Sequence, residues 1–424
     1  MADLKIGQVG CSGMGLRHLY GQIESKRVFG TFDYAAVCDL NASAAEHVAA
    51  EAERGLGKRP NVYTDFDEML DKETGLDAVD IVTNVGTHHV LALKAFDAGV
   101  NVATEKPLAL SVRAGRRMIE AAERSGKVLS VSENYRRDPL NRLAKAVLDS
   151  GALGKRRLMM DILTWGTRVM PHTTAWRHQK VRGGYLLDYG VHETDLFLFF
   201  MGDADRVYAE TSIWEKERYS TKDPLGSQMA RYYRHRVKEE IELAETVETT
   251  SEDMNLAVIR FESGAMGHFA MSIAAPGERT TADIVYCADG SMRLPGSRSG
   301  RPARVTMLDA NEPLSEKEVL ALVPDFELDD LTARIFDGSR RLSSYESGFE
   351  QADAKLIALE LEDFAQAVLN DRQPDVTGEA GLKAVALVYA ILESGHLHQP
   401  VSFADVVADR VNSYQQEINE AVGL

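Results

Sequence analysis

The sequence of 424 residues has little cysteine, no long hydrophobic run and no excess of basic residues. Its three cysteines, Cys11, Cys38 and Cys287, are odd in number and widely spaced, which excludes a disulfide framework and fits a reducing compartment. A net charge of −17 disfavours a nucleic-acid partner, because binding a phosphate backbone needs a basic face. No stretch reaches the roughly 18 apolar residues of a membrane span, and the N-terminus lacks a signal-peptide apolar region. We therefore predict a cytoplasmic protein that binds neither nucleic acid nor membrane.

The length exceeds what one hydrophobic core usually serves, so we expect more than one domain. Buried strand patterns alternate with amphipathic helical patterns over residues 1–133, which predicts an α/β domain with a doubly wound parallel sheet. The strands are expected at 4–9, 34–38, 78–82, 100–103 and 128–131, and the helices at 43–52, 90–98 and 111–125.

The order of strand and helix patterns changes after residue 133, which predicts a second domain over 134–400 and a C-terminal helical tail over 401–424. Strand-like runs separated by turn signals indicate a meander. The predicted elements are strands at 157–164, 256–261, 265–273, 284–287 and 305–308, and helices at 352–369 and 378–394.

A glycine-rich turn follows the first predicted strand, with Gly10 and Gly15 at the outer positions of a G-x-G-x-x-G pattern and Ser12 at the middle one. Unpaired N–H groups and the helix dipole at such a helix start favour a diphosphate. The alternative is a turn that merely joins strand to helix. Asp39 ends the second strand, where a carboxylate accepts hydrogen bonds from ribose hydroxyls and repels a 2′-phosphate. The pattern favours NAD over NADP, unless Asp39 only caps the next helix.

Two further stretches carry candidate chemistry. Lys106 stands at the carboxyl end of a predicted parallel strand, where open α/β sheets bind ligands, and Pro107 fixes the backbone after it. Asp188 and His192 lie four residues apart on a predicted helix that begins at Gly183 and Gly184, so they share one face. The alternative is that Asp188 caps that helix and His192 packs in the core. Gly190 between them indicates that another group approaches the backbone closely.

These motifs together resemble the Gfo/Idh/MocA oxidoreductases, the relatives of glucose–fructose oxidoreductase and inositol dehydrogenase. The resemblance runs from about residue 4 to 402 and rests on the ordered succession of the glycine turn at 10–15, Thr83 with His88, Gly99-x-x-Val102-x-x-Glu105-Lys106-Pro107, Asn134-Tyr135-Arg136-Arg137-x-Pro139, and Gly183-Gly184-x-x-x-Asp188-x-Gly190-x-His192.

The resemblance implies a Rossmann domain followed by an α+β domain with a large, mostly antiparallel open sheet. The open face of that sheet commonly packs on another subunit, which implies a homodimer or homotetramer. It also implies a catalytic set of Lys106, Asp188 and His192. The expected cofactor contacts are Gly10, Ser12, Gly13, Met14, Gly15, Asp39, Thr83, Asn84, His88, Glu105, Lys106 and Asn134.

These residue types suit hydride transfer from a secondary hydroxyl to NAD. A neutral imidazole at His192 can accept the hydroxyl proton, and the Lys106 ammonium can stabilise developing alkoxide charge. Asp188 either orients the imidazole or binds a neighbouring substrate hydroxyl. A second possibility is a redox-assisted glycosidase, in which transient oxidation permits elimination and the cofactor is regenerated. A third is a non-catalytic regulator that binds NAD.

Sugars, sugar acids and cyclitols are the expected substrates. The loop from 165 to 182 supplies aromatic faces and cations, although its tryptophans can equally pack at the domain junction while its arginines are solvated. No metal site is expected, because His172 and His178 fit no common metal-binding spacing. The expected substrate contacts are Tyr135, Arg136, Trp165, His172, Trp176, Arg177, Asp188 and His192.

Two features depart from the family pattern. Asn84 stands where the family commonly has proline after Thr83, which predicts slightly altered contacts on the nicotinamide side. Residues 214–248 read as an insertion rich in arginine, glutamate and tyrosine. This insertion is interpreted as a solvated helix and loop, or as a segment that covers the site or contacts another subunit.

Overall fold

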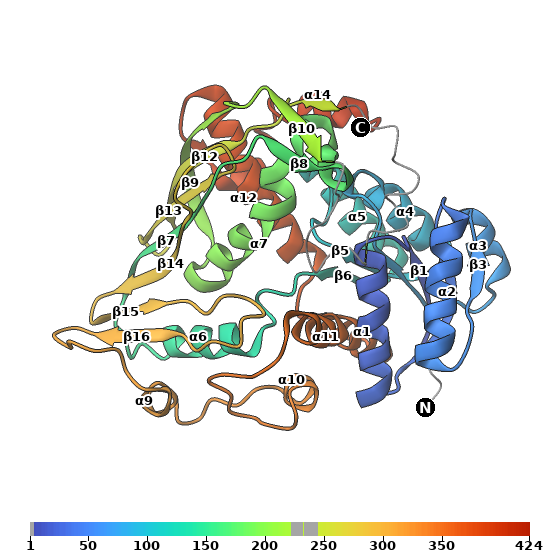
Figure 1. Ribbon diagram of the computed structural model, residues 1–424, viewed down its shortest axis with the longest axis horizontal. Coiled ribbons are helices and arrows are strands. Elements are labelled where there is room, and N and C mark those ends of the chain that lie inside the picture. Colours follow the sequence, from blue (N-terminus) through green and yellow to red (C-terminus); the bar gives the residue numbers. More distant parts are fainter. Residues whose placement is uncertain (1–3, 222–231, 233–244) are drawn as a thin grey trace.

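A six-stranded parallel sheet forms the first domain of the computed structural model, which describes residues 4–221, 232 and 245–424 (Figure 1). The strand order β3-β2-β1-β4-β5-β6 confirms the doubly wound α/β prediction. The one unpredicted strand, β3, has three residues, too few to show a hydrophobic period. The strands are β1 (Leu4–Val9), β2 (Phe32–Cys38), β3 (Asn61–Tyr63), β4 (Ala78–Ile81), β5 (Asn101–Glu105) and β6 (Leu129–Ser132).

Helices connect these strands, and several begin with a side-chain cap at the carboxyl end of the sheet. The side chains of Asn41, Asn84 and Ser111 each accept a backbone N–H in the first turn of the following helix. The caps fix where each helix starts and so fix the loops that line the carboxyl edge. The helices are α1 (Met14–Val28), α2 (Ala42–Leu56), α3 (Phe66–Lys72), α4 (Val85–Asp97) and α5 (Val112–Ser125).

An eight-stranded sheet forms the second domain, in the order β16-β15-β14-β7-β13-β12-β9-β17. Only β7 and β13 pair in parallel, so the mostly antiparallel sheet is confirmed. The predicted meander is wrong, because β7 lies between the consecutive strands β13 and β14. The strands are β7 (Arg156–Thr164), β9 (Ala204–Ser212), β12 (Met254–Phe261), β13 (Met266–Ser272), β14 (Thr280–Cys287), β15 (Gly290–Arg293), β16 (Arg304–Met307) and β17 (Val401–Ser402).

A three-stranded sheet, β11-β10-β8, lies at one edge of the molecule. It consists of β8 (Val169–Pro171), β10 (Glu217–Thr221) and β11 (Thr246–Glu248). The ends of the predicted insertion at 214–248 are therefore strands, which corrects the expected helix and loop there. Its central residues, 222–231 and 233–244, lie outside the described part of the chain.

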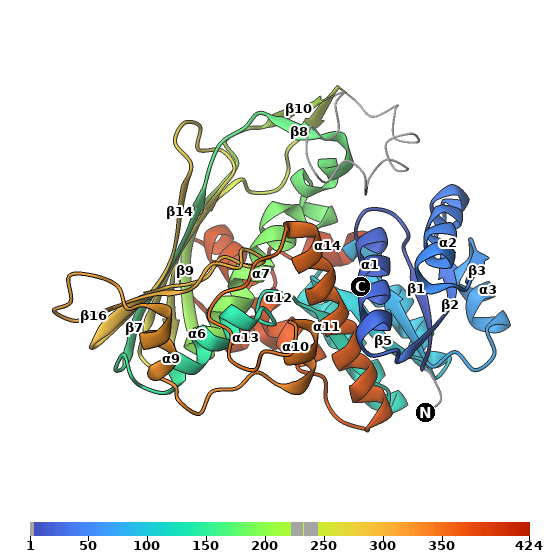
Figure 2. The same cartoon turned by 60° about the horizontal axis from the view of Figure 1, so that its bottom comes forward.

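Long helices fill the space between the two large sheets (Figure 2). The helix α7 (Gly184–Met201) begins at the predicted glycines and packs on β7 and β13, α11 (Phe349–Leu369) packs on α1, and α12 (Gly378–Leu397) contacts α5, α7 and β9. Of the described helices, only α12 is long and apolar enough to cross a membrane, and 78% of its most apolar window is buried inside the protein. Its hydrophobicity is therefore that of a core helix.

The C-terminal tail joins the two domains. Its first residues form β17 beside β9, and side chains further on reach α5: Ser111 Oγ lies 2.6 Å from Asn419 Oδ1, and Arg113 Nε lies 2.8 Å from Asp409. The tail is therefore helical only in part. The remaining helices are α6 (Pro139–Asp149), α9 (Glu316–Ala321), α10 (Asp330–Ile335), α13 (Phe403–Val407) and α14 (Gln416–Ala421), with short 3₁₀ helices at His172–His178 and Lys180–Arg182.

Candidate active site

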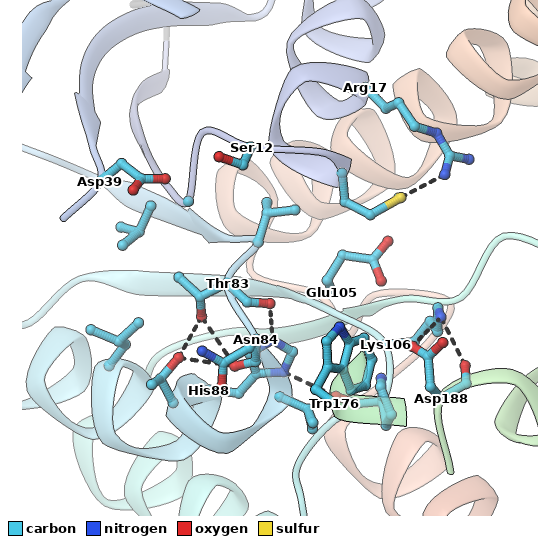
Figure 3. Close-up of a pocket in the computed structure, with 18 of the residues that line it drawn as sticks. Ser12, Arg17, Asp39, Thr83, Asn84, His88, Glu105, Lys106, Trp176 and Asp188 are labelled. Carbon is cyan, nitrogen blue, oxygen red and sulfur yellow. Dashed lines mark hydrogen bonds and ion pairs between the residues drawn. The ribbon is translucent and has the colours of Figure 1, made fainter. Parts of the chain in front are cut away.

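A cavity of about 690 Å³ lies at the carboxyl ends of β1, β2, β4 and β5 and extends to α7 of the second domain. Figure 3 shows Ser12 and Asp39 toward one end and Lys106 and Asp188 toward the other. The cavity thus joins the predicted cofactor residues to the predicted catalytic residues. Most of the predicted contacts line it: Gly10, Ser12, Met14, Asp39, Thr83, Asn84, His88, Glu105, Lys106, Asn134, Tyr135, Trp176, Arg177, Asp188 and His192.

The glycine turn approaches its surroundings too closely for any side chain at two positions. A Cβ at Gly15 would lie 2.1 Å from the carbonyl oxygen of Gly10. Gly10 has a φ of +98°, and a Cβ there would lie 2.5 Å from the carbonyl oxygen of Val82. Gly15 thus lets α1 approach the turn closely, and Gly10 lets the turn approach the residues after β4.

The start of α1 has no side-chain cap. Among the described residues, none accepts a hydrogen bond from the backbone N–H of Ser12 or Met14, whereas the N–H of Gly13 donates to the carbonyl oxygen of Tyr232 at 3.0 Å. Unpaired N–H groups at a helix start suit an anion. The turn therefore fits a diphosphate, although a phosphate oxygen at Gly13 would compete with the Tyr232 carbonyl.

The carboxylate of Asp39 is held in place by backbone N–H groups. One oxygen accepts from Cys11 at 2.7 Å and the other from Asn41 at 2.9 Å. The cap of α2 is Asn41, so the alternative in which Asp39 caps this helix is wrong. Asp39 is thus fixed at the end of β2 beside the glycine turn, with its side chain on the cavity wall.

The imidazole of His88 connects the segment after β4 to the loop after β5. The imidazole of His88 lies 3.0 Å from the carbonyl oxygen of Pro107 through Nδ1 and 3.2 Å from that of Thr83 through Nε2. Asn84 caps α4 by accepting from the N–H of Gly86 at 3.1 Å. His88 therefore braces the cavity wall, and Asn84 supplies a cap where proline would supply none.

Lys106, Asp188 and Arg177 form an ion-pair cluster at the second-domain end of the cavity. The Nζ atom of Lys106 lies 3.0 Å from the backbone oxygen of Asp188 and 3.5 Å from its Oδ1, while Arg177 Nε donates to Oδ2 at 2.6 Å. Burial alone would raise the pKa of Asp188, but Arg177 and Lys106 lower it to about 2. Asp188 is therefore an anion, and Arg177 is not simply solvated.

His192 is held on one ring face and at one ring nitrogen. Its Nδ1 lies 2.7 Å and 2.9 Å from the two carboxyl oxygens of Glu133, and its ring stacks on Tyr135 at 4.0 Å between centroids. Burial, together with the charges of Lys106 and Arg298, lowers the pKa of His192 well below its ordinary value. The imidazole is therefore neutral near pH 7.

Glu133, rather than Asp188, is the carboxylate that contacts the imidazole, which corrects one of the two roles expected for Asp188. Both Asp188 and His192 line the cavity from α7, and the N-cap of α7 is Gly183, so the alternative in which Asp188 caps this helix is wrong. Gly190 lies between them, and a Cβ there would lie 2.8 Å from Cδ1 of Leu186 in the same helix and 3.3 Å from the sulfur of Met271 on β13. The close approach expected at Gly190 is thus made by the Leu186 side chain of α7 and by Met271 of the sheet.

Glu105 contributes to a buried network beneath the cavity. His18 lies between Asp80, at 2.9 Å from Nδ1, and Glu105, at 3.3 Å from Nε2, and all three side chains are buried. Although burial opposes protonation of His18, the two carboxylates raise its pKa well above the ordinary value. Glu105 is therefore tied to α1 through this histidine, as well as lining the cavity.

Four described residues among the predicted contacts do not line the cavity: Gly13 and Gly15 of the glycine turn, and Arg136 and Trp165. Arg136 pairs with Asp195 of α7, with 2.7 Å from Nε to Oδ2, and is not among the residues that line the cavity, so its contact with substrate stays a prediction. Trp165 packs edge-on against Tyr185 and Tyr189 of α7, at 5.8 Å and 6.3 Å between centroids, so these ring contacts lie within the second domain. The side chain of His172 lies outside the described residues.

Several cavity residues have no counterpart among the sequence predictions. They include Arg17, Thr87, Thr174, Tyr189 and Arg298, and Glu133 stands directly behind the cavity wall. Glu133 could have been found, because it follows β6 at the same carboxyl edge as Lys106. Arg298 lies on a loop far along the chain, and it reaches the site through an ion pair with Asp353 at 2.7 Å that has no local sequence signal.

Two family models match the chain over most of its length. Residues 4–133 match the oxidoreductase family with an NAD-binding Rossmann fold, and residues 141–293 match the Gfo/Idh/MocA C-terminal domain. The chain belongs to the Gfo/Idh/MocA oxidoreductase family. Its first domain is accordingly an NAD-binding Rossmann domain, and the glycines of the turn, which carry no side chain, and the fixed Asp39 fit that cofactor.

Similar proteins act on sugars and cyclitols. A levoglucosan dehydrogenase of Pseudarthrobacter phenanthrenivorans is 30% identical over 51% of this chain and 56% of its own length. A myo-inositol 2-dehydrogenase of Thermotoga maritima is 25% identical over 95% of this chain and its entire length. The crystal structure of an NAD-binding oxidoreductase from Klebsiella pneumoniae has a TM-score of 0.74 at 23% identity, covering 95% of this chain and 99% of that one, which supports the fold.

Proposed function

We propose that this oxidoreductase oxidises a secondary hydroxyl of a sugar, sugar acid or cyclitol with NAD. The observation that carries the proposal is the convergence of Lys106, Asp188 and His192 at one end of the cavity that begins at the glycine turn and Asp39. The bound cofactor would be held by the turn at 10–15, Asp39, Thr83 and Asn134. It supplies the nicotinamide that accepts a hydride.

His192 acts as the general base. Its low pKa keeps the imidazole neutral near pH 7, so a ring nitrogen can accept the proton of the substrate hydroxyl. No described residue is hydrogen-bonded to Nε2, which lies across the ring from the Glu133 contact. The proton therefore passes to Nε2.

Lys106 stabilises the negative charge that develops on the substrate oxygen. Its ammonium is held at the cavity wall by the backbone oxygen and the carboxylate of Asp188. A positioned cation of this kind favours the transition state more than the neutral hydroxyl. The second pair, between Asp188 and Arg177, leaves the Asp188 carboxylate fixed, so it can accept a hydrogen bond from an adjacent substrate hydroxyl.

A polyhydroxylated ring suits the remaining wall. Tyr135, Trp176 and Tyr189 supply aromatic faces, and Arg177 and Arg298 supply cations. Rings with several hydroxyls bind such walls through their apolar faces and through polar contacts at the rim. The named activities of the similar dehydrogenases, on levoglucosan and myo-inositol, support this substrate class.

The decisive experiment is a substrate screen with the purified protein and NAD. Free sugars, sugar acids and cyclitols are tested for NADH formation, and aryl glycosides are tested for aglycone release. NADH formation with a free polyol supports the dehydrogenase. Aglycone release without net NADH would favour a redox-assisted glycosidase, and tight NAD binding with no turnover in either assay would favour a regulator.

Substitution of Asp39 by alanine is expected to weaken the preference for NAD. Loss of an anionic acceptor for the ribose hydroxyls should lower kcat/KM for NAD by about 10- to 100-fold, while kcat/KM for NADP stays level or rises. The comparison is made by steady-state kinetics with both cofactors. Asp33→Ala is the control, because Asp33 lies at the other end of β2 and pairs with the exposed Lys58. An unchanged cofactor ratio would contradict the role of Asp39.

We further propose that the protein forms a homodimer or homotetramer through the outer face of the eight-stranded sheet. Among the described helices, none covers that face (Figure 2), and neighbouring strands expose large apolar side chains on it. Val258 is 52% exposed and stands opposite Tyr208 and His268 in the ladder. Contiguous exposed apolar patches of this kind mark interaction surfaces. The other members of the patch are Leu256, Met266 and Tyr286.

A charge placed in the centre of this patch is expected to dissociate the oligomer. Val258→Glu should shift the molar mass measured by light scattering toward one subunit, because burying an unpaired carboxylate is costly. The matched control is Leu369→Glu, since Leu369 is a 43% exposed apolar residue at the end of α11. A monomeric parent protein, or an oligomer that survives Val258→Glu, would contradict this interface.

The three cysteines are all buried and unpaired. Free thiols are typical of reducing compartments. We therefore propose the cytoplasm as the site of action.

A further inference from the structure

The geometry points to Glu133 as the residue that fixes the orientation and tautomer of His192. This inference rests on the proposed function, in which His192 is the base. Glu133 is a positioning residue: it contacts the imidazole and does not line the cavity. Neither the family motifs nor the sequence analysis assigns it a role.

The position of Glu133 is determined by the fold. It directly follows β6, and its Oε1 accepts the backbone N–H of Tyr135 at 3.0 Å. The same oxygen lies 2.7 Å from His192 Nδ1, and Oε2 lies 2.9 Å from it, so both carboxyl oxygens face one ring nitrogen. Tyr135 stacks on the imidazole with an angle of 5° between the rings. The imidazole is therefore fixed in its plane and at Nδ1.

The protonation state of Glu133 decides which tautomer His192 adopts. When Glu133 is ionised it can only accept, so Nδ1 carries the hydrogen and Nε2 keeps a lone pair for the substrate proton. When Glu133 is protonated it donates to Nδ1, and the hydrogen of the neutral imidazole then sits on Nε2. Only the first arrangement provides a base at Nε2.

Burial raises the pKa of Glu133 to about 7. The ionised carboxylate, and with it the base-competent tautomer, is therefore present above this pH and is lost as the pH falls through it. The backbone N–H of Tyr135 and the charges of Lys106 and Arg136 act against this rise, and the carboxylate of Glu105 adds to it. Other titratable groups that interact with Glu133 from the neighbouring helices are Glu193, Asp195 and Glu360.

The test combines spectroscopy with kinetics on the full-length protein. The tautomer of His192 is read from the imidazole ¹⁵N shifts of histidine-labelled protein, with His192→Gln used to assign its signals. In the parent protein, the Nδ1–H tautomer should dominate above the pKa of Glu133 and give way to Nε2–H below it. Glu133→Leu should favour the Nε2–H tautomer at every pH.

Glu133→Leu should also lower kcat by about 10- to 100-fold, the factor for losing a hydrogen bond to a charged acceptor, with the Kd for NAD unchanged. The fall in kcat/KM on the acid side should disappear with the carboxylate. Glu133→Asp, which keeps a carboxylate on a shorter stem, should restore part of the activity and the pH dependence. If Glu133→Leu does not fold, the test relies on the pH titration of the His192 tautomer in the parent protein and on the activity of Glu133→Asp.

An Nε2–H tautomer in the parent protein at high pH would overturn the inference. So would a Glu133→Leu protein with parental tautomer and kcat. The ¹⁵N measurement needs no substrate, so the two possible failures can be told apart. If the proposed function fails, no polyol is oxidised but the tautomer of His192 still follows the protonation of Glu133. If the role of Glu133 fails, the tautomer does not follow it.

Discussion

Replacement of His192 by alanine is expected to lower kcat by about 100- to 10,000-fold, the usual range for losing a general base. The effect should be large because the imidazole lies at the cavity wall beside Lys106 and has its proton-accepting nitrogen free of other described partners. The measurement is steady-state NADH formation with the best polyol of the screen. NAD binding should be retained, since His192 lies at the end of the cavity away from the glycine turn.

A control separates the loss of the base from a general effect of removing a histidine. His47→Ala changes a half-buried histidine of α2 that does not line the cavity, and it should leave kcat unchanged. Near-parental kcat in His192→Ala would remove His192 from the mechanism. A uniform loss of NAD binding in His192→Ala would instead indicate that the histidine supports the fold of the site.

The first domain could be predicted because the hydrophobic periods that indicate its strands and helices lie within short stretches of the sequence. Each buried strand and each amphipathic helix shows its own period, and the glycine pattern directly after β1 marks the start of α1. The same logic placed Lys106 correctly, because carboxyl ends of parallel strands meet at one edge. Applied to β6, it would also have led to Glu133.

The second sheet was harder to predict because strand pairing is not local. The patterns at β7, β13 and β14 identify strands, but nothing in their periodicity says that β7 lies between the other two. The ion pair of Arg136 could not be predicted for a similar reason. Its partner Asp195 lies on α7, and only the packed structure shows that the two side chains meet.

Arg298 shows how distant residues complete the site. Its guanidinium lies 5.2 Å from the ring centroid of Tyr135, and Tyr135 in turn stacks on His192. Asp353 of α11 holds the same guanidinium, and it also pairs with Arg17 of α1. A chain of contacts therefore runs from the Rossmann domain to the imidazole, which couples the geometry of the base to the packing of the two domains.

Replacement of Lys106 by methionine is expected to lower kcat by about 100- to 1,000-fold, the range for removing one group that stabilises transition-state charge. Methionine keeps much of the side-chain length and removes the ammonium. Arg177 still holds Asp188 in this variant, so the substrate pocket should persist. Lys94→Met is the control, because Lys94 is exposed on α4 and pairs with Asp67 at the surface.

A second measurement tests the electrostatic role of Lys106 separately from its effect on rate. The positive charge of Lys106 helps to lower the pKa of His192, so its removal should raise that pKa. A protonated imidazole cannot accept the substrate proton, and Lys106 also lowers the pKa of Glu133, so the acid limb of kcat/KM should move to higher pH and the histidine titration must be read separately by ¹⁵N shifts. A slowed enzyme with an unshifted histidine titration would mean that the ammonium does not act on this imidazole, whereas parental kcat in Lys106→Met would remove Lys106 from charge stabilisation altogether.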